Sequence, residues 1–301
     1  MKISIIVTCY NNSGSLPELW ERLQKLSEKP IFQNHYFEFL FVDDGSEDST
    51  YSVLQQFQSF HNHEVVLVKL TRNFGSYNSF LAGMSHAGGQ ANVYLHADLQ
   101  DPPELIEEMF TYFLKDIPLV IAHRESREDG SIFSSLYHWM VRTFAIQKTP
   151  PGGFDLLLFH EKIRNDVVSI SEKSTNNVYL INWLGYPFVQ IPYKRLKRRH
   201  GKSQWSLRKK AHLFIDTVFS FTNLPLDFIR FLGFLSIINL GLAGYFLVFQ
   251  GSSISHQLWF WTSTILFMLG MLGIILGEYL FRVHETVRNR PNFVVESRIK
   301  Q

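Results

Sequence analysis

The sequence predicts an α/β domain with a mostly parallel sheet, followed by two C-terminal transmembrane helices. Over residues 1 to about 195, short apolar runs of strand length alternate with helical segments, as in a parallel sheet covered on both faces. Two uncharged runs follow, Phe231–Phe249 and Leu258–Gly277. At ~1.5 Å per residue, each is long enough to cross the roughly 30 Å hydrocarbon core of a bilayer. Two buried core helices are the less favoured alternative.

Six strands and six helices are expected in the first 195 residues. The first helix has a clear start signal, because Ser15 precedes it and Glu18 follows three residues later, a capping-box pattern, with Pro17 in the first turn. The predicted strands are Ile3–Thr8, Glu38–Val42, Val65–Leu70, Asn92–Leu95, Leu119–Ala122 and Phe188–Tyr193. The predicted helices are Leu16–Leu26, Ser49–Phe60, Tyr77–His86, Glu104–Leu114, Ile132–Phe144 and Lys162–Ser171.

Composition and charge set the domain boundaries and narrow the function class. The formal net charge of +2 argues against a general nucleic-acid-binding protein, although nine Lys and Arg and no acid fall within residues 194–210. The single cysteine, Cys9, excludes an internal disulfide and fits a reducing compartment. No signal peptide is visible. We expect the α/β domain over 1–204, an interfacial segment over 205–226, membrane helices (about 229–250 and 257–280) within 227–283, and a tail over 284–301.

The distribution of positive charge predicts the orientation in the membrane. Arg and Lys precede the first apolar run and follow the second, whereas the loop Gln250–Gln257 has neither. Positive residues favour the cytoplasmic side. We therefore expect a multi-pass protein of the cell (inner) membrane with the α/β domain and both termini in the cytosol. Trp205–Thr222 is interpreted as an interfacial helix on an anionic leaflet, with a plain surface helix as the alternative.

The most specific chemistry lies in the run His96-Ala97-Asp98-Leu99-Gln100-Asp101. It follows a predicted buried strand and precedes a helix, so it lies outside the carboxyl edge of the sheet, where ligands bind in open α/β folds. Oxygen ligands from Asp98 and Gln100 suit Mg²⁺ or Mn²⁺, with a diphosphate supplying further oxygens. Asp101 also fits a helix N-cap, because Glu104 follows three residues later.

Five segments together resemble glycosyltransferase family 2, and within it the dolichol-phosphate mannosyltransferases and bacterial polyprenyl-phosphate sugar transferases. They are Ile5–Asn12 (IIVTCYNN), Val42–Ser46 (VDDGS), Arg72–Gly75 (RNFG), Ala97–Glu104 (ADLQDPPE) and Arg198–Ser203 (RRHGKS). The two apolar runs followed by Gly277-Glu278-Tyr279-Leu280 also look like the bacterial members. The resemblance covers nearly the whole chain and implies a GT-A, Rossmann-like nucleotide-diphospho-sugar transferase domain.

The resemblance implies roles for the residues at matching positions. The nucleotide would be bound by Thr8, Tyr10, Asn12, Val42, Asp43, Asp44, Arg72, His96 and Ala97. A carboxylate such as Asp44 can accept hydrogen bonds from a base or a ribose, although it also suits a helix cap. Phosphate oxygens would be held by Arg124, Arg198, Lys202, Ser203 and Gln204. The catalytic candidates are Asp98, Arg124 and Asp155, and the metal ligands are Asp98, Gln100 and His96.

The chain also departs from the family pattern. His96 stands where the family has an Asp, so as a ligand it would favour Mn²⁺ over Mg²⁺; alternatively it contacts only the ribose or a metal-bound water. Gln204 replaces a Lys, a charge that Lys202 can supply. Asp155 lies two positions from the place of the family Asp and is interpreted as an orienting or oxocarbenium-stabilising group.

These features predict a membrane-anchored, inverting hexosyltransferase of the cell envelope. It would move a sugar from a nucleoside-diphosphate sugar, with UDP preferred, to the phosphate of a polyprenyl lipid such as undecaprenyl phosphate. An acceptor phosphate is already anionic and needs no general base. The alternatives are transfer to another lipid such as diacylglycerol, and a non-catalytic homologue with a binding role. The expected partners are the nucleotide sugar, the polyprenyl phosphate and the membrane; a homo-oligomer or a flippase partner stays open, and no nucleic acid is expected.

Overall fold

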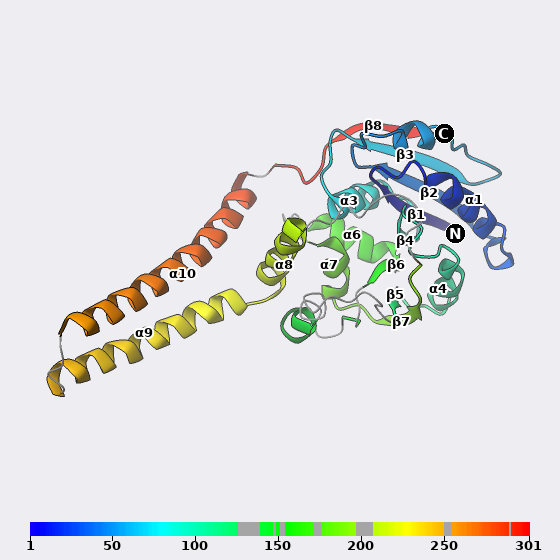
Figure 1. Ribbon diagram of the computed structural model, residues 1–301. Helices are drawn as coiled ribbons and strands as arrows, with labels where there is room; N and C mark the ends of the chain where they lie inside the picture. The colour runs from blue at the N-terminus through cyan, green and yellow to red at the C-terminus, as the bar shows by residue number, and fades with distance from the viewer. Residues whose placement is uncertain are drawn as a thin grey trace. The chain divides into compact units, whose positions relative to one another are not determined.

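The computed structural model describes residues 1–125, 139–146, 149–150, 154–170, 176–196, 207–249, 254–288 and 290–301 (Figure 1). The chain divides into two compact units. The first comprises residues 1–214 and 291–301, and the second comprises residues 215–290. The last residues therefore return to the unit in which the chain begins, so 291–301 form part of the α/β domain and not a separate tail.

The first unit is built on a mixed sheet with the strand order β7-β5-β6-β4-β1-β2-β3-β8. The strands are β1 (Lys2–Cys9), β2 (Tyr36–Asp43), β3 (Glu64–Leu70), β4 (Ala91–His96), β5 (Leu119–Arg124), β6 (Phe154–His160), β7 (Phe188–Tyr193) and β8 (Val295–Lys300). The pairs β1–β2, β1–β4, β2–β3 and β5–β7 are parallel. β6 runs antiparallel to β4 and β5, and β8 runs antiparallel to β3. All six predicted strands are confirmed, while β6 and β8 were not predicted.

Helices cover both faces of this sheet. They are α1 (Leu16–Ser27), the 3-10 turn η1 (Pro30–Phe32), α2 (Thr50–Leu54), α3 (Ser76–His86), α4 (Leu105–Phe113), the π-helical turn η2 (Val141–Ala145), α6 (Glu161–Ser169) and α7 (Asn177–Trp183). The predicted helix Ile132–Phe144 falls mostly outside the described residues, and the predicted Ser49–Phe60 is observed only as the short α2. The short helix α7 was not predicted.

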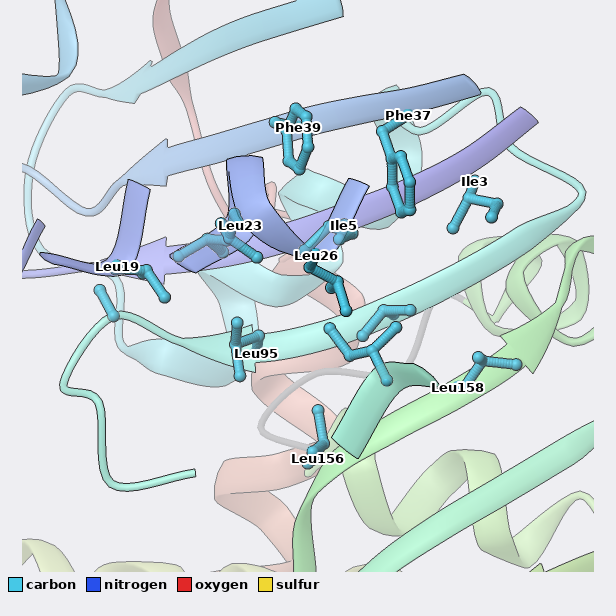
Figure 2. Close-up of a cluster of buried hydrophobic side chains, with 14 of the residues drawn as sticks. Ile3, Ile5, Leu19, Leu23, Leu26, Phe37, Phe39, Leu95, Leu156 and Leu158 are labelled. Atoms are coloured by element: carbon cyan, nitrogen blue, oxygen red, sulfur yellow. The ribbon is translucent and has the colours of Figure 1, made fainter. Parts of the chain in front are cut away.

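Alternation along β1 divides the core into two layers. Ile3 and Ile5 lie in the layer that contains α1, and Figure 2 shows them with Leu19 and Leu23 of that helix. The next residue, Ile6, faces α3 instead, where a Cβ added to Gly83 would lie 2.2 Å from its Cγ2 atom. Successive side chains of β1 point to opposite faces of the sheet, and both faces are covered. β1 is therefore apolar throughout, which makes it easy to recognise in the sequence.

The predicted capping box at the start of α1 is wrong. The Ser15 hydroxyl donates instead to the carbonyls of Asn12 (3.1 Å) and Ala97 (2.6 Å), and its side chain makes no cap hydrogen bond. Ser15 is buried. A buried hydroxyl needs a partner, and the Ala97 carbonyl just beyond β4 supplies it. The start of α1 is thereby tied to the loop that carries Asp98.

The helical unit contains the C-terminal part of α8 (Leu207–Phe221), from Ile215 onward, together with α9 (Leu224–Phe249) and α10 (Ile254–Arg288). Among the described residues, the segment Thr264–Arg288 is long and apolar enough to cross a membrane. A second span is counted only if Phe214–Phe221 and Leu224–Asn239, bent by 80°, act together. Two separate spans are therefore not established by helix length and composition.

Both long helices nevertheless expose large apolar side chains. Ile237 of α9 is 71% exposed and Ile274 of α10 is 69% exposed. Ser236 of α9 donates to the Met268 sulfur of α10 at 3.1 Å, so the two helices touch along one side. Apolar surface of this extent requires a lipid or protein environment. The exposure argues against the alternative of two buried core helices.

Charged residues join the C-terminal half of α8 to the end of α10. Arg282 donates to Asp216 at 2.9 Å and also pairs with Glu278, one turn earlier on its own helix. Phe219 and Tyr279 pack edge to face beside this group, with ring centroids 5.2 Å apart. The side chain of Arg282 is only 17% exposed, so these partners neutralise a largely enclosed cation.

Candidate active site

The predicted donor-binding residues gather at the carboxyl edge of the three central strands. In register, Thr8 of β1 lies opposite both Val42 of β2 and His96 of β4. Asp43 is the last residue of β2, opposite Cys9. The parallel pairing thus brings together residues that are 34 to 88 positions apart in the sequence. This edge is where open α/β folds bind their ligands.

Asp44 joins the end of β2 to the loop before α3. Its Oδ1 accepts from the Phe74 N–H at 2.7 Å and its Oδ2 from the Gly75 N–H at 3.0 Å. Burial raises the pKa of Asp44 to about 6. The predicted cap of the next helix, α2, is not observed, because the carboxylate instead binds the backbone of the RNFG loop (72–75) just before α3 begins at Ser76. A nucleotide-binding role for Asp44 remains a proposal.

Gly45 allows the two loops to meet. Its φ of +65° lies in the left-handed region, which favours glycine. A Cβ at this position would lie 2.4 Å from the backbone carbonyl carbon of Arg72. The Arg72 guanidinium in turn lies over the Phe74 ring, 4.1 Å from its centroid. The VDDGS turn (42–46) and the RNFG loop (72–75) are therefore one packed unit.

Asp43 differs from Asp44 because part of its carboxylate lacks a partner. Its Oδ1 accepts from the Ser46 N–H at 3.3 Å, while the buried Oδ2 has no hydrogen-bond partner among the described residues. Burial raises the pKa of Asp43. An unsatisfied buried acceptor at a sheet edge is a place where a polar ligand can complete the hydrogen bonding. By contrast, Asn12 accepts from its neighbour Tyr10 N–H at 2.8 Å, so this amide oxygen shapes its own loop.

Both ring nitrogens of His96 have hydroxyl partners. Nδ1 lies 3.3 Å from the Thr8 hydroxyl and Nε2 lies 3.2 Å from the Tyr94 hydroxyl. Burial lowers the pKa of His96, which favours the neutral imidazole at pH 7. In this arrangement neither nitrogen is directed to a metal. This pairing does not favour His96 as a metal ligand, and its other predicted role, contact with the ribose or a metal-bound water, stays a prediction.

The loop after β4 carries the oxygen donors Asp98 and Gln100. The Gln100 N–H donates to Asp98 Oδ1 at 3.1 Å, and Leu99 between them has φ of +58°. A bulky side chain in the left-handed region costs roughly 1–2 kcal/mol, and such strain gathers at functional sites. No group of three His, Cys, Asp or Glu converges within the described chain. One carboxylate and one amide fit a magnesium-type ion that takes its other ligands from substrate phosphates and water.

Arg124 and Asp155 form an ion pair across the neighbouring strands. Arg124 ends β5, is 6% exposed, and its Nη2 donates to Asp155 Oδ2 near the start of β6. The buried Nε of Arg124 has no hydrogen-bond partner among the described residues. Two of the three predicted catalytic residues are therefore in contact, and the arginine retains a donor for a further acceptor.

Asp101 is not the predicted N-cap of α4. The helix begins at Leu105, with Glu104 in the N-cap position and no side-chain cap. Asp101 is 1% exposed and instead accepts from the Tyr193 hydroxyl at the end of β7. Sequence reasoning missed this contact because its partners lie 92 positions apart. The predicted phosphate-binding residues Arg198, Lys202, Ser203 and Gln204 lie outside the described residues.

Comparison with solved structures supports the fold. Glucosyl-3-phosphoglycerate synthase from Mycobacterium tuberculosis in complex with UDP is similar, with a TM-score of 0.51 at 12% identity. The match covers 72% of this chain and 79% of that chain. At this identity the likeness concerns the fold alone, and it confirms the predicted GT-A-like α/β domain.

Comparison of sequences shows the family. The model of glycosyl transferase family 2 matches residues 4–169. The whole chain is 32% identical to an undecaprenyl-phosphate 4-deoxy-4-formamido-L-arabinose transferase of Sodalis glossinidius, of which it covers 94%. It is 30% identical to an uncharacterized glycosyltransferase of Synechocystis, with coverage of 98% of this chain and 95% of that one. The chain belongs to glycosyltransferase family 2.

Proposed function

We propose that this protein is a membrane-anchored, metal-dependent transferase that moves a sugar from a nucleoside-diphosphate sugar, with UDP as the first choice, to polyprenyl phosphate. The proposal depends mainly on one observation: the loop with the oxygen donors Asp98 and Gln100 and the buried Arg124 lie at the same edge of the sheet. A relative that is similar over the full length is named an undecaprenyl-phosphate sugar transferase, which supports this acceptor class.

Asp98 and Gln100 would hold Mg²⁺ or Mn²⁺ together with the donor diphosphate. The bound ion would neutralise the diphosphate and stabilise the charge that develops on the leaving group. The neutral His96, held by Thr8 and Tyr94, would support the floor of this site. The orphaned Oδ2 of Asp43 supports a nucleotide at the adjacent strand end.

The reaction proposed is a single displacement with inversion. An oxygen of the acceptor phosphate attacks the anomeric carbon, the bond from that carbon to the diphosphate oxygen breaks, and the electron pair leaves on the nucleoside diphosphate. No proton is removed from the acceptor, because the phosphate is already ionised. Arg124 would hold the diphosphate through its remaining N–H groups. Asp155, engaged by Arg124, would orient that guanidinium and stabilise positive charge at the sugar.

The topology supports two membrane crossings. The chain leaves the α/β domain after β7 and returns to it as β8, which pairs with β3. A segment that starts and ends in one domain crosses a membrane an even number of times. With α9 and α10 as the candidate crossings, the two chain segments that join these helices to the α/β domain lie on the same side of the membrane. The positive charges beside the apolar runs favour the cytosol as that side. We therefore propose a multi-pass cell-membrane protein with the catalytic domain and both termini in the cytosol.

A panel of nucleotide sugars tests the proposal. Purified protein in detergent is incubated with undecaprenyl phosphate, Mn²⁺ and UDP- or GDP-linked hexoses, and lipid products are identified by mass spectrometry. We expect a product heavier than the lipid phosphate by one sugar residue, with inverted anomeric configuration by NMR. A product on added diacylglycerol would assign a different acceptor. Metal-dependent nucleotide-sugar binding without any product would instead support a non-catalytic role.

A further inference from the structure

The loop that carries Asp98 is fastened to the chain segment that follows β7. The Tyr193 hydroxyl donates to Asp101 Oδ1, and Arg195 Nε lies 3.6 Å from the same oxygen. The Leu196 N–H donates to the Gln100 carbonyl at 2.9 Å. In return, the Gln100 side-chain amide donates to the Leu196 carbonyl at 3.4 Å. Four contacts thus join Gln100 and Asp101 to residues 193–196.

The Asp101 carboxylate is the centre of this cluster and is almost entirely enclosed, with 1% exposure. Tyr193 is 5% exposed, and burial beside Asp101 raises its pKa, so its hydroxyl remains a proton donor. An enclosed carboxylate is costly unless hydrogen bonds and a cation compensate it. Tyr193 supplies a hydrogen bond to this carboxylate, and Arg195 supplies the cation. Loss of either partner leaves a buried carboxylate that is less well compensated, and movement of the loop toward solvent is one way to relieve that cost.

Movement of Asp101 would reach the proposed metal ligands directly. Asp101 follows Gln100 in the chain, and Asp98 is held to the Gln100 N–H. The Gln100 side-chain NH₂ donates to the Leu196 carbonyl, so the oxygen of the same amide is turned away from residue 196. Groups that fix the orientation of a ligand typically control metal affinity by 10–100-fold.

We propose that Asp101, Tyr193 and Arg195 form a positioning cluster that holds Asp98 and Gln100 in the geometry required to bind a divalent cation with a nucleoside diphosphate. This assignment rests on the proposed function, because it presumes a metal–nucleotide site on this loop. The three residues act through the loop and not by contact with the ion. The cluster also makes the end of β7 part of the donor site, although β7 lies at the far edge of the sheet from β1 and β2.

Direct titration of the full-length protein with Mn²⁺, followed by electron paramagnetic resonance in the presence of UDP or GDP, tests the cluster without relying on turnover. We expect Tyr193→Phe to weaken Mn²⁺ binding about 10-fold and Asp101→Asn about 10–100-fold. Excess Mn²⁺ should restore most of the kcat of Tyr193→Phe while its requirement for metal stays raised. Arg195→Lys should retain more affinity than Arg195→Ala.

Tyr186→Phe is the matched control. Tyr186 also donates to an aspartate, Asp166 of α6, at 2.5 Å, but that pair is not connected to the loop after β4. Its Mn²⁺ affinity should equal that of the wild type. If wild-type protein binds Mn²⁺ with a nucleotide and all cluster variants bind it equally well, the positioning role is overturned while the proposed function stands. If the folded wild type binds no Mn²⁺ with either nucleotide, the proposed function fails and takes this assignment with it.

Discussion

Replacement of Gly45 by Ala tests whether the two donor loops form one unit. The substitution has two separable costs. The first is backbone strain, because φ is +65° and an alanine in the left-handed region costs roughly 1–2 kcal/mol. The second is a collision, because the new Cβ would lie 2.4 Å, 2.6 Å and 2.8 Å from three backbone atoms of Arg72 and Asn73.

Gly185→Ala isolates the first cost. Gly185 has φ of +78°, and the nearest atom to an added Cβ is the Trp183 carbonyl oxygen at 4.0 Å, an ordinary contact. The control should therefore lose about 1 kcal/mol, or about 2–4 °C in Tm for a domain of this size. Gly45→Ala adds an overpacking cost of about 1–3 kcal/mol, because the Arg72 backbone must move by roughly 1 Å. Its Tm should fall about twice as far or more.

The effect of Gly45→Ala on donor binding distinguishes a specific effect on the two loops from a general loss of stability. A shift of roughly 1 Å at the RNFG loop can lower the productive use of the donor by about 100-fold. Thermal unfolding and the KM for the nucleotide sugar are measured for both variants at a temperature where both are folded. A Gly45→Ala protein that is no less stable than Gly185→Ala and retains the wild-type KM would refute the contact between these loops.

Asp98→Asn should abolish turnover with an unchanged Tm, and near-wild-type activity would remove Asp98 from the site. The raised pKa of Asp44, from 3.8 to about 6, means that the folded protein binds this proton more tightly than the unfolded chain. Stability from this group therefore rises by about 2 kcal/mol as pH falls from 7 to 4. In urea unfolding, wild type should thus gain stability relative to Asp44→Asn at pH 4 compared with pH 7, and parallel responses of the two proteins would contradict this prediction. Deletion of residues 295–301 exposes the edge of β3, so it should lower the Tm and cause aggregation that light scattering detects. A deletion variant that stays monodisperse with an unchanged Tm would show that β8 is dispensable. Replacement of residues 208–210 by Ala should raise the KM for long-chain lipid, because each cation contributes about 1 kcal/mol of attraction to an anionic leaflet. The KM for a short, water-soluble acceptor should stay unchanged, and equal losses with both acceptors would place these residues in the active site.

The strands β1 and β2 could be predicted because apolar residues dominate both of their faces. β1 and β2 are buried almost throughout, so their sequences differ clearly from the loops around them. β8 has the opposite character, because it alternates Val295, Ser297 and Ile299 with charged residues at an edge. Its pairing depends on backbone hydrogen bonds to β3, which leave little trace in composition. An edge strand contributed from the far end of the chain is difficult to predict for this reason.

The site shows the same division. Asp43, Asp98 and Arg124 could be predicted to lie at strand ends, because each comes at or just after the close of an apolar run, and parallel strands share a carboxyl edge. The caps failed because tertiary contacts took their side chains: Ser15 donates to Ala97, and Asp101 accepts from Tyr193. A local pattern such as a capping box describes only what a helix end can do alone. It does not include a partner that the fold brings from 82 or 92 residues away.

The central claim is that the phosphate of the lipid is the nucleophile. A direct comparison of undecaprenyl phosphate with undecaprenol, the same chain without the phosphate, tests it with one donor and one enzyme preparation. We expect rapid transfer to the phosphate and no glycosylated product from the alcohol, because no group in the proposed mechanism removes a proton. Transfer to undecaprenol at a comparable rate would contradict a phosphate nucleophile and would require a general base at this site.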